Sequence, residues 1–240
     1  MAYDFLGLVN DVNRRVNEVE LTYSNFDSAN GFYNAAKDSV NAAIRAVDYQ
    51  QFEWPFNHST QSDTTVAGTT RYDFPYDNKT VDMESFRVRR SEALNTETVR
   101  LQHIQYEEYL DKYVDQEYNS TNANSGTPRY VFRTPDNRYG LVPLPDKAYT
   151  VDYEYYRINS DMILPTDVPS IPEQFRYVIV EGAMYHVFLF RGNTQDATLA
   201  QQRFNDGLKQ MRTVYINRYD YVRTSQIIRS ARTGGYTKVE

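Results

Sequence analysis

A proline-punctuated segment that runs into a long apolar stretch, residues 168–191, constrains the fold more than any other part of the chain. Pro172 suits the first turn of a helix because its missing N–H has no intrahelical partner there, and Glu173 complements the positive end of the helix dipole. The apolar side chains that follow cover more than one helical face, which is typical of a helix buried on several sides. The segment therefore predicts a central packing helix. The residues expected in the core are Trp54, Phe175, Tyr177, Ile179 and Phe188.

A second, charged helix is predicted directly after the first. Gly192 and Asn193 are of the residue types that end helices, and Thr194 is suited to cap the next one. Apolar residues then recur at spacings of three to five as far as Tyr215, which indicates one helical face. The chain from Thr194 to about Tyr221 therefore predicts an antiparallel partner helix.

The first fifty residues predict two further helices. Apolar side chains from Phe5 to Val19 follow the i, i+3, i+4, i+7 rule, with Asp4 placed to cap the helix. A second helix is expected from about Ser28 to Phe52, and its stripe of alanine and aliphatic residues permits close approach to the buried helix. Together with the C-terminal pair, these helices predict one bundle.

Between the helices, short alternating runs bounded by turns predict a β lobe. The expected strands lie at 69–74, 86–90, 130–133, 141–144 and 151–157, the third and fourth forming a hairpin. A short helix is expected over 104–118, before a loop rich in Ser, Thr, Asn and Gly.

The predicted fold class is α+β, with a helical bundle, an inserted antiparallel β lobe and an extended C-terminal tail. The bundle is expected from the N-terminal helices (1–56) and the C-terminal helices (169–222). The β-rich lobe is expected at 57–168 and the docking tail at 223–240. A chain of 240 residues can bury one core, or a core with a subsidiary lobe.

Composition excludes several classes of function. The chain has no cysteine, which removes disulfides, thiolate chemistry and every metal site that contains cysteine. The mean hydropathy is −0.70, and neither a long apolar run nor a signal-peptide pattern is present, so we expect no membrane partner and a cytosolic site of synthesis.

The sequence shows no catalytic constellation, and we expect neither enzymatic activity nor a cofactor. His58, His103 and His186 lie in three separate segments without a second ligand at metal-binding spacing. Glu107 with Glu108, or Asp115 with Glu117, would serve glycoside hydrolysis only across a cleft of defined width. No phosphate-binding glycine loop and no nucleophile elbow occurs.

The formal charge of −6 is unevenly distributed. Residues 218–240 carry five basic and two acidic side chains, a charge of +3, which leaves −9 for the first 217 residues. A basic end on an acidic body favours docking on an acidic protein surface; nucleic acid is a weaker alternative, and a solvated terminus a third. The proposed docking residues are Arg223, Ile227, Ile228, Arg229, Arg232 and Tyr236.

The chain contains 22 tyrosines, and ten of them fall within residues 106–156. Tyrosine suits subunit interfaces and sugar-stacking surfaces, because it offers a large contact area with few rotatable bonds and a polar tip. Half-buried strand positions explain the same abundance. The tyrosines predicted at a subunit or tail interface are Tyr106, Tyr109, Tyr113, Tyr130 and Tyr139.

The order of the elements and two groups of residues resemble tail tubular protein A, the head-to-tail adaptor (gatekeeper) family of short-tailed bacteriophages. The first group follows the second helix and comprises Phe52, Trp54, Pro55 and Phe56. The second opens the buried helix and comprises Pro172, Glu173, Phe175, Arg176, Tyr177, Ile179 and Val180. A looser match continues through Phe190 and Gly192, whereas the β lobe matches only in kind.

The resemblance implies a structural virion protein of the tail or neck, made in the host cytoplasm, that forms a homo-oligomeric ring of twelve subunits under the portal protein. It implies that the ring continues the channel for passing double-stranded DNA, without sequence-specific binding, and meets a tail nozzle or tail tube protein. An acidic body suits such a channel because like charge repels the DNA phosphates. Two alternatives stay open: a tail-associated carbohydrate-binding module and a cell-wall hydrolase.

Overall fold

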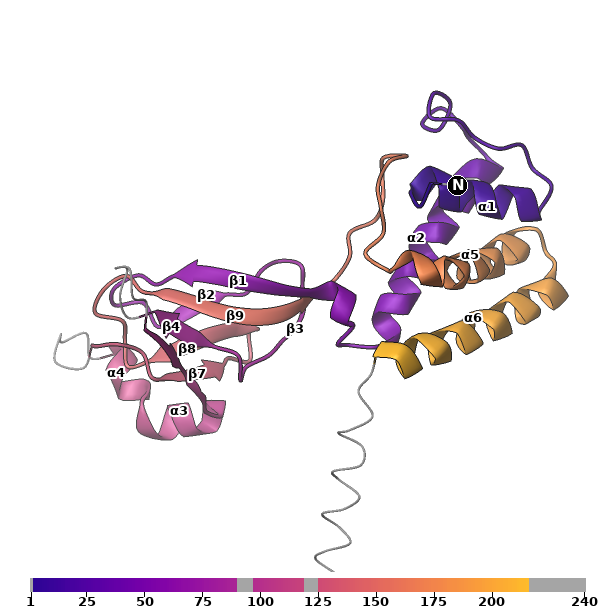
Figure 1. Cartoon of the computed structure of the whole chain (residues 1–240). Coiled ribbons are helices and arrows are strands. Elements are labelled where there is room, and N and C mark those ends of the chain that lie inside the picture. Colours follow the sequence, from indigo (N-terminus) through magenta and orange to yellow (C-terminus); the bar gives the residue numbers. More distant parts are fainter. Residues whose placement is uncertain (1, 90–96, 119–124, 216–240) are drawn as a thin grey trace, which may run out of the picture. The chain divides into compact units, whose positions relative to one another are not determined.

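The computed structural model describes residues 2–89, 97–118 and 125–215 (Figure 1). The chain divides into two compact units, and the described residues build an α+β fold, as the sequence predicts. The helical unit consists of the described parts of Met1–Val47 and Asp161–Glu240, and the β unit is Asp48–Ser160.

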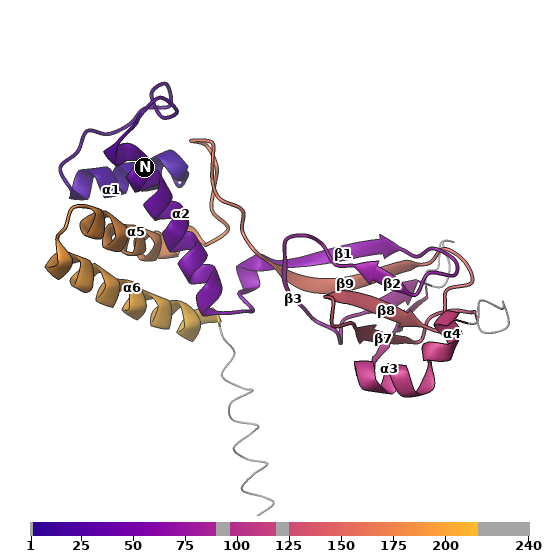
Figure 2. The ribbon, with the colours of Figure 1, turned by 180° about the vertical axis from the view of Figure 1, so that it is seen from behind.

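The helical unit contains one helix pair from each end of the chain. Its elements are α1 (Phe5–Arg15), α2 (Phe32–Gln50, whose last residues fall in the β unit), the 3₁₀ turn η3 (Glu173–Phe175), α5 (Arg176–Phe190) and α6 (Thr194–Tyr215). Two opposite views both show α5 between α1 and α6 (Figures 1 and 2).

Helix α1 begins where the sequence predicts and ends earlier. Asp4 caps it, because its Oδ1 accepts a hydrogen bond from the backbone N–H of Gly7 at 2.7 Å. The helix ends at Arg15, because Asn17 takes a left-handed backbone with φ of 59°. The expectation that Val19 continues the apolar stripe is wrong, since its side chain is 74% exposed.

Small residues set the spacing of the helices around α5. A Cβ atom added to Gly182 of α5 would lie 2.9 Å from Ala43 of α2 and 2.9 Å from the Phe204 ring of α6. A Cβ atom added to Gly207 of α6 would lie 2.8 Å from Val178. Contacts this short leave no room for a side chain, so α5 packs closely against both neighbours.

The two ends of α5 differ in detail from the sequence prediction. The chain after Pro172 makes the turn η3 first, and α5 begins only at Arg176. At the other end, Gly192 has a φ of 73°, and Asn193 rather than Thr194 caps α6, because its Oδ1 accepts from the N–H of Asp196 at 3.2 Å. The predicted extension of this helix toward Tyr221 lies outside the described residues.

Four of the five side chains expected in the core are at least half-buried. Trp54 and Ile179 are fully enclosed, Phe175 is 6% exposed, and Phe188 is half-buried. Tyr177 is a correction, because its side chain is 38% exposed and its hydroxyl donates to Oε1 of Gln210 at 2.6 Å on the surface of α6.

The β unit holds two sheets. The first contains β1 (His58–Thr64), β9 (Thr150–Arg157), β4 (Arg87–Arg89) and β5 (Thr98–Arg100) in that order, with β3 (Asn78–Val81) also paired to β9. The second runs β2 (Arg71–Asp73), β8 (Arg138–Val142), β7 (Tyr130–Arg133), β6 (Gln102–His103). The remaining elements are the 3₁₀ turn η1 (Pro55–Asn57), α3 (Tyr106–Lys112) and α4 (Val114–Tyr118).

Several strands lie where alternation predicts them, including the antiparallel hairpin of β7 and β8. The lobe is not purely antiparallel, because β6 pairs with β7 in parallel. The predicted single helix is two short helices, α3 and α4. Alternation also missed β1, a wholly polar strand that pairs with β9 along its full length.

Two aromatic clusters fill the β unit. In the first, the rings of Phe86 and Tyr153 stack at 4.5 Å, and the hydroxyls of Tyr139 and Tyr153 donate to Oδ2 of Asp63 at 2.9 and 3.0 Å. Burial, followed by the charge of Asp63, raises the pKa of both tyrosines. In the second cluster, Phe132 stacks on Tyr109 of α3 at 3.9 Å.

Candidate interaction surfaces

Three of the polar groups that could have suggested catalysis have structural partners. Glu108 pairs with Lys112 at 2.7 Å, and Glu117 accepts from Arg71 at 3.1 Å and from the hydroxyl of Tyr109. His58 lies 3.2 Å from Glu154 in an exposed pair. Across residues 2–89, 97–118 and 125–215, no group of three or more His, Cys, Asp or Glu is arranged to hold a metal ion.

The tyrosines proposed for an interface separate into two groups. Tyr109 and Tyr139 are 1% and 0% exposed, so their prediction as interface residues is wrong: they are core side chains whose hydroxyls donate to partly buried carboxylates. Tyr106, Tyr113 and Tyr130 are partly buried around the Tyr109–Phe132 cluster. The six docking residues proposed in the tail, Arg223 to Tyr236, lie outside the described residues.

The loop at 161–168, which we call the aliphatic loop, is bound to α2. The side-chain amide of Asn41 donates to the carbonyl of Met162 at 3.0 Å and accepts from its N–H at 3.1 Å. The guanidinium of Arg45 donates to both carboxylate oxygens of Asp161, at 2.7 and 2.6 Å. The side-chain amide of Asn41 thus makes the pair of backbone hydrogen bonds that a neighbouring strand would make, and it fixes the backbone of Met162.

The same loop is bound to the first turn of α1. The N–H of Phe5 donates to the carbonyl of Asp167 at 2.8 Å, and that of Leu6 donates to the carbonyl of Pro165 at 3.0 Å. The first N–H groups of a helix have no intrahelical acceptor. These two bonds therefore give the N–H groups of Phe5 and Leu6 their acceptors, and they attach the loop to the start of α1. The sequence gives no local signal of this contact, since the partners lie about 160 residues apart.

A turn within the loop directs its apolar side chains outward. Oδ2 of Asp167 accepts from the N–H groups of Ile163 and Leu164 at 2.7 and 2.8 Å. The side chains of Ile163, Leu164 and Val168 are 76%, 56% and 64% exposed. A braced loop with three exposed aliphatic side chains in six residues is a candidate contact surface, because apolar groups gathered on a surface mark interaction sites.

A pocket of about 460 Å³ opens elsewhere on the helical unit, and we call it the α5–α6 pocket. It is lined by Arg15, Glu181, Met184, Phe188, Asp196, Leu199, Ala200 and Arg203. Nη1 of Arg15 lies 2.5 Å from Oε1 of Glu181, a carboxylate that is mostly buried, while Arg203 lies 4.0 Å from the same oxygen and is 60% exposed. The pocket thus combines an apolar lining with a neutralised carboxylate and an exposed cation.

His186 on α5 provides a test of electrostatics in the helical unit. Its pKa is lowered, first by burial and second by the charge of Arg45. A lowered folded-state pKa contributes stability that is present above the unfolded pKa of about 6.5 and is lost as the pH falls through the folded pKa. We therefore expect His186→Gln to reduce the loss of stability on acidification below that pH, measured by denaturant unfolding at a series of pH values. An unchanged pH dependence would contradict the shift.

The α+β fold and the exposed aliphatic loop suit a protein that works through contacts with other proteins. The model of the SU10 adaptor protein family matches residues 3–229, and the chain therefore belongs to this family of phage adaptor proteins. Its members are structural proteins of the phage particle, not known as enzymes. No curated protein matches the chain. Among the described residues, no helix is long and apolar enough to span a membrane.

Proposed function

We propose that this protein is a head-to-tail adaptor that forms a homo-oligomeric ring of twelve subunits, joins the portal protein to the tail nozzle or tail tube, and continues the DNA channel. The family match over residues 3–229 carries the proposal. The arrangement proposed is that of tail tubular protein A, which the two ends of the chain resemble.

The charge distribution supports a role around passing DNA. The first 217 residues carry a formal charge of −9, and a wall of the same sign as the phosphates neither grips nor retains the duplex. The tail at 223–240, with its basic side chains, is proposed to dock on the portal or on a neighbouring subunit.

Deleting Ser225–Glu240 tests this function. The truncated chain is expected to keep its melting temperature, because the described core ends before the deletion, and to lose attachment to DNA-filled heads. Attachment is measured by sedimentation of heads with bound adaptor. Removing only Thr237–Glu240, which spares the six proposed docking residues, is the matched control and should leave attachment intact. Particle assembly at the wild-type level with the longer deletion would refute the role of the tail.

Two of the five tyrosines proposed for contacts cannot stack on a sugar. Tyr109 and Tyr139 are enclosed in the β unit, and a sugar ring needs an accessible aromatic face. The adaptor function remains the one that the observations favour.

A further inference from the structure

We propose that the aliphatic loop of one subunit inserts Ile163 and Leu164 into the α5–α6 pocket of the next subunit, and that this contact builds the ring. The inference rests on the proposed function, because it assigns the surfaces through which the ring assembles. The partner is a second copy of this chain.

The loop has the properties of a preformed anchor. Hydrogen bonds from Asn41, Phe5 and Leu6 hold its backbone, and the Asp167 carboxylate fixes the turn. Binding through a segment that is already ordered avoids most of the entropic cost of association. Ile163 and Leu164 favour association, since the burial of exposed aliphatic side chains removes apolar surface from water.

The pocket has the matching properties of a receptor. Leu199 is 46% exposed and Phe188 is half-buried, so apolar surface remains in contact with water in the isolated subunit. The volume of about 460 Å³ falls in the range that accommodates small apolar groups. Apolar side chains of a partner would complete the packing that α5 and α6 leave open at this end.

Charge favours the same occupant. The loop at 161–168 carries two carboxylates, Asp161 and Asp167, and no basic side chain. At the pocket, Arg15 already engages Glu181 at 2.5 Å, which leaves the exposed guanidinium of Arg203 to meet an incoming carboxylate. The Asp161 side chain is 49% exposed beside its Arg45 partner and is accessible for such a contact.

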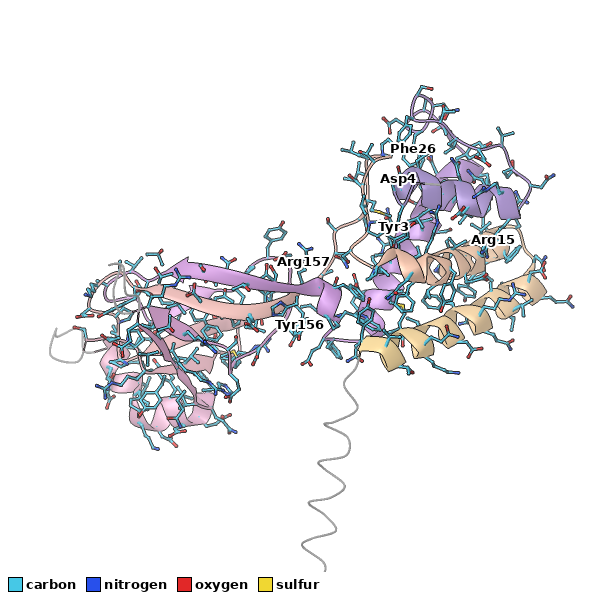
Figure 3. The ribbon with its side chains drawn as sticks, in the orientation of Figure 1. Tyr3, Asp4, Arg15, Phe26, Tyr156 and Arg157 are labelled. Atoms are coloured by element: carbon cyan, nitrogen blue, oxygen red, sulfur yellow. The ribbon has the colours of Figure 1, made fainter. Side chains whose placement is uncertain are left out.

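The loop and the pocket lie at opposite ends of α1 within one compact unit. The loop accepts hydrogen bonds from Phe5 and Leu6 at the start of the helix, whereas Arg15 at its end lines the pocket. Figure 3 shows Asp4 and Arg15 at the two ends of α1. When two complementary surfaces lie at different places on one subunit, copies join head to tail, and the result is a ring if the rotation closes.

Engineered cysteines test the contact, because the natural chain has none. The full-length chain carrying Ile163→Cys and Leu199→Cys is assembled on DNA-filled heads, oxidised mildly and separated without reductant. A disulfide forms only when the two Cα atoms lie within about 7 Å. The double variant is expected to give a ladder of covalent multimers. A mixture of the two single variants is expected to give dimers only, and neither single variant is expected to cross-link alone.

The matched control keeps Ile163→Cys and moves the second thiol along α6 to Val214→Cys, which is 61% exposed and lies outside the pocket. It is expected to give no ladder. A ladder of equal strength from this control, or dimers from Ile163→Cys alone, would overturn the proposal, the latter by showing a symmetric loop-to-loop contact.

Imaging of the same samples distinguishes a failure of the loop-in-pocket contact from a failure of the adaptor function. Rings on heads without cross-links between positions 163 and 199 would overturn the loop-in-pocket contact and leave the adaptor function standing. Heads that carry isolated subunits and no ring would overturn both the loop-in-pocket contact and the adaptor function. Because both substituted side chains are exposed, an unchanged melting temperature is expected and shows that each variant is folded.

Discussion

Replacing Gly140 by valine is expected to destabilise the β unit by about 3 kcal/mol, because the added side chain overpacks the core and displaces a buried aromatic ring. Gly140 of β8 pairs with Phe132 of β7, and an added Cβ atom would lie 2.1 Å from the Phe132 ring. The ring cannot move aside easily, since it is fully buried and stacks on Tyr109 at 3.9 Å. Glycine at this position is therefore part of the aromatic packing.

Trp54 provides the measurement for this variant. It is the single tryptophan of the chain and is fully buried in the β unit, so its fluorescence reports unfolding of that unit. Gly126→Ala is the control, because a Cβ atom there meets only Pro143 at 3.8 Å, an ordinary contact. An unfolding midpoint for Gly140→Val equal to that of the control would show that the Phe132 ring does not cover Gly140.

The sequence predicted the elements whose signals are local. Asp4 caps α1 because a short polar side chain before an apolar period satisfies the free N–H groups of a helix start. The stripe of small residues on α2 predicted close approach to the buried helix, and Ala43 does meet Gly182 of α5. Hydrophobic alternation located β9, which has partners on both sides and buries alternate side chains.

Local signals failed where tertiary structure determines the outcome. Strand β1 lies at the edge of its sheet, so its seven residues are polar and the hydrophobic alternation that marks a half-buried strand is absent. Tyrosine abundance could not distinguish the core from the surface, because Tyr109 and Tyr139 pack in aromatic clusters and their hydroxyls find carboxylate acceptors, Glu117 and Asp63, that lie far away in the sequence or on another element.

The exposed position of Ile163 and Leu164 could not be predicted from the sequence around them. It depends on the amide of Asn41, which lies 121 residues from Met162 in the sequence. An asparagine among alanines on a helix is ordinarily a surface residue or a neutral substitution, and only the fold shows that it replaces a strand partner. The sequence therefore predicts contact residues among the tyrosines and in the tail, and it does not indicate the aliphatic loop.

Replacing Phe175 by alanine is expected to destabilise the helical unit by about 3–5 kcal/mol, as a large-to-small change in a core. The side chain is 6% exposed, at the junction of η3 and α5, and its ring lies 5.7 Å from that of Tyr215 on α6. Phe190→Ala makes the same chemical change at the other end of α5, where the side chain is 63% exposed, and should cost less than about 1 kcal/mol. Denaturant unfolding followed by the circular dichroism of the helices measures both. Equal losses for the two variants would contradict the burial of Phe175, and with it the way that the segment after Pro172 anchors α5 against α6.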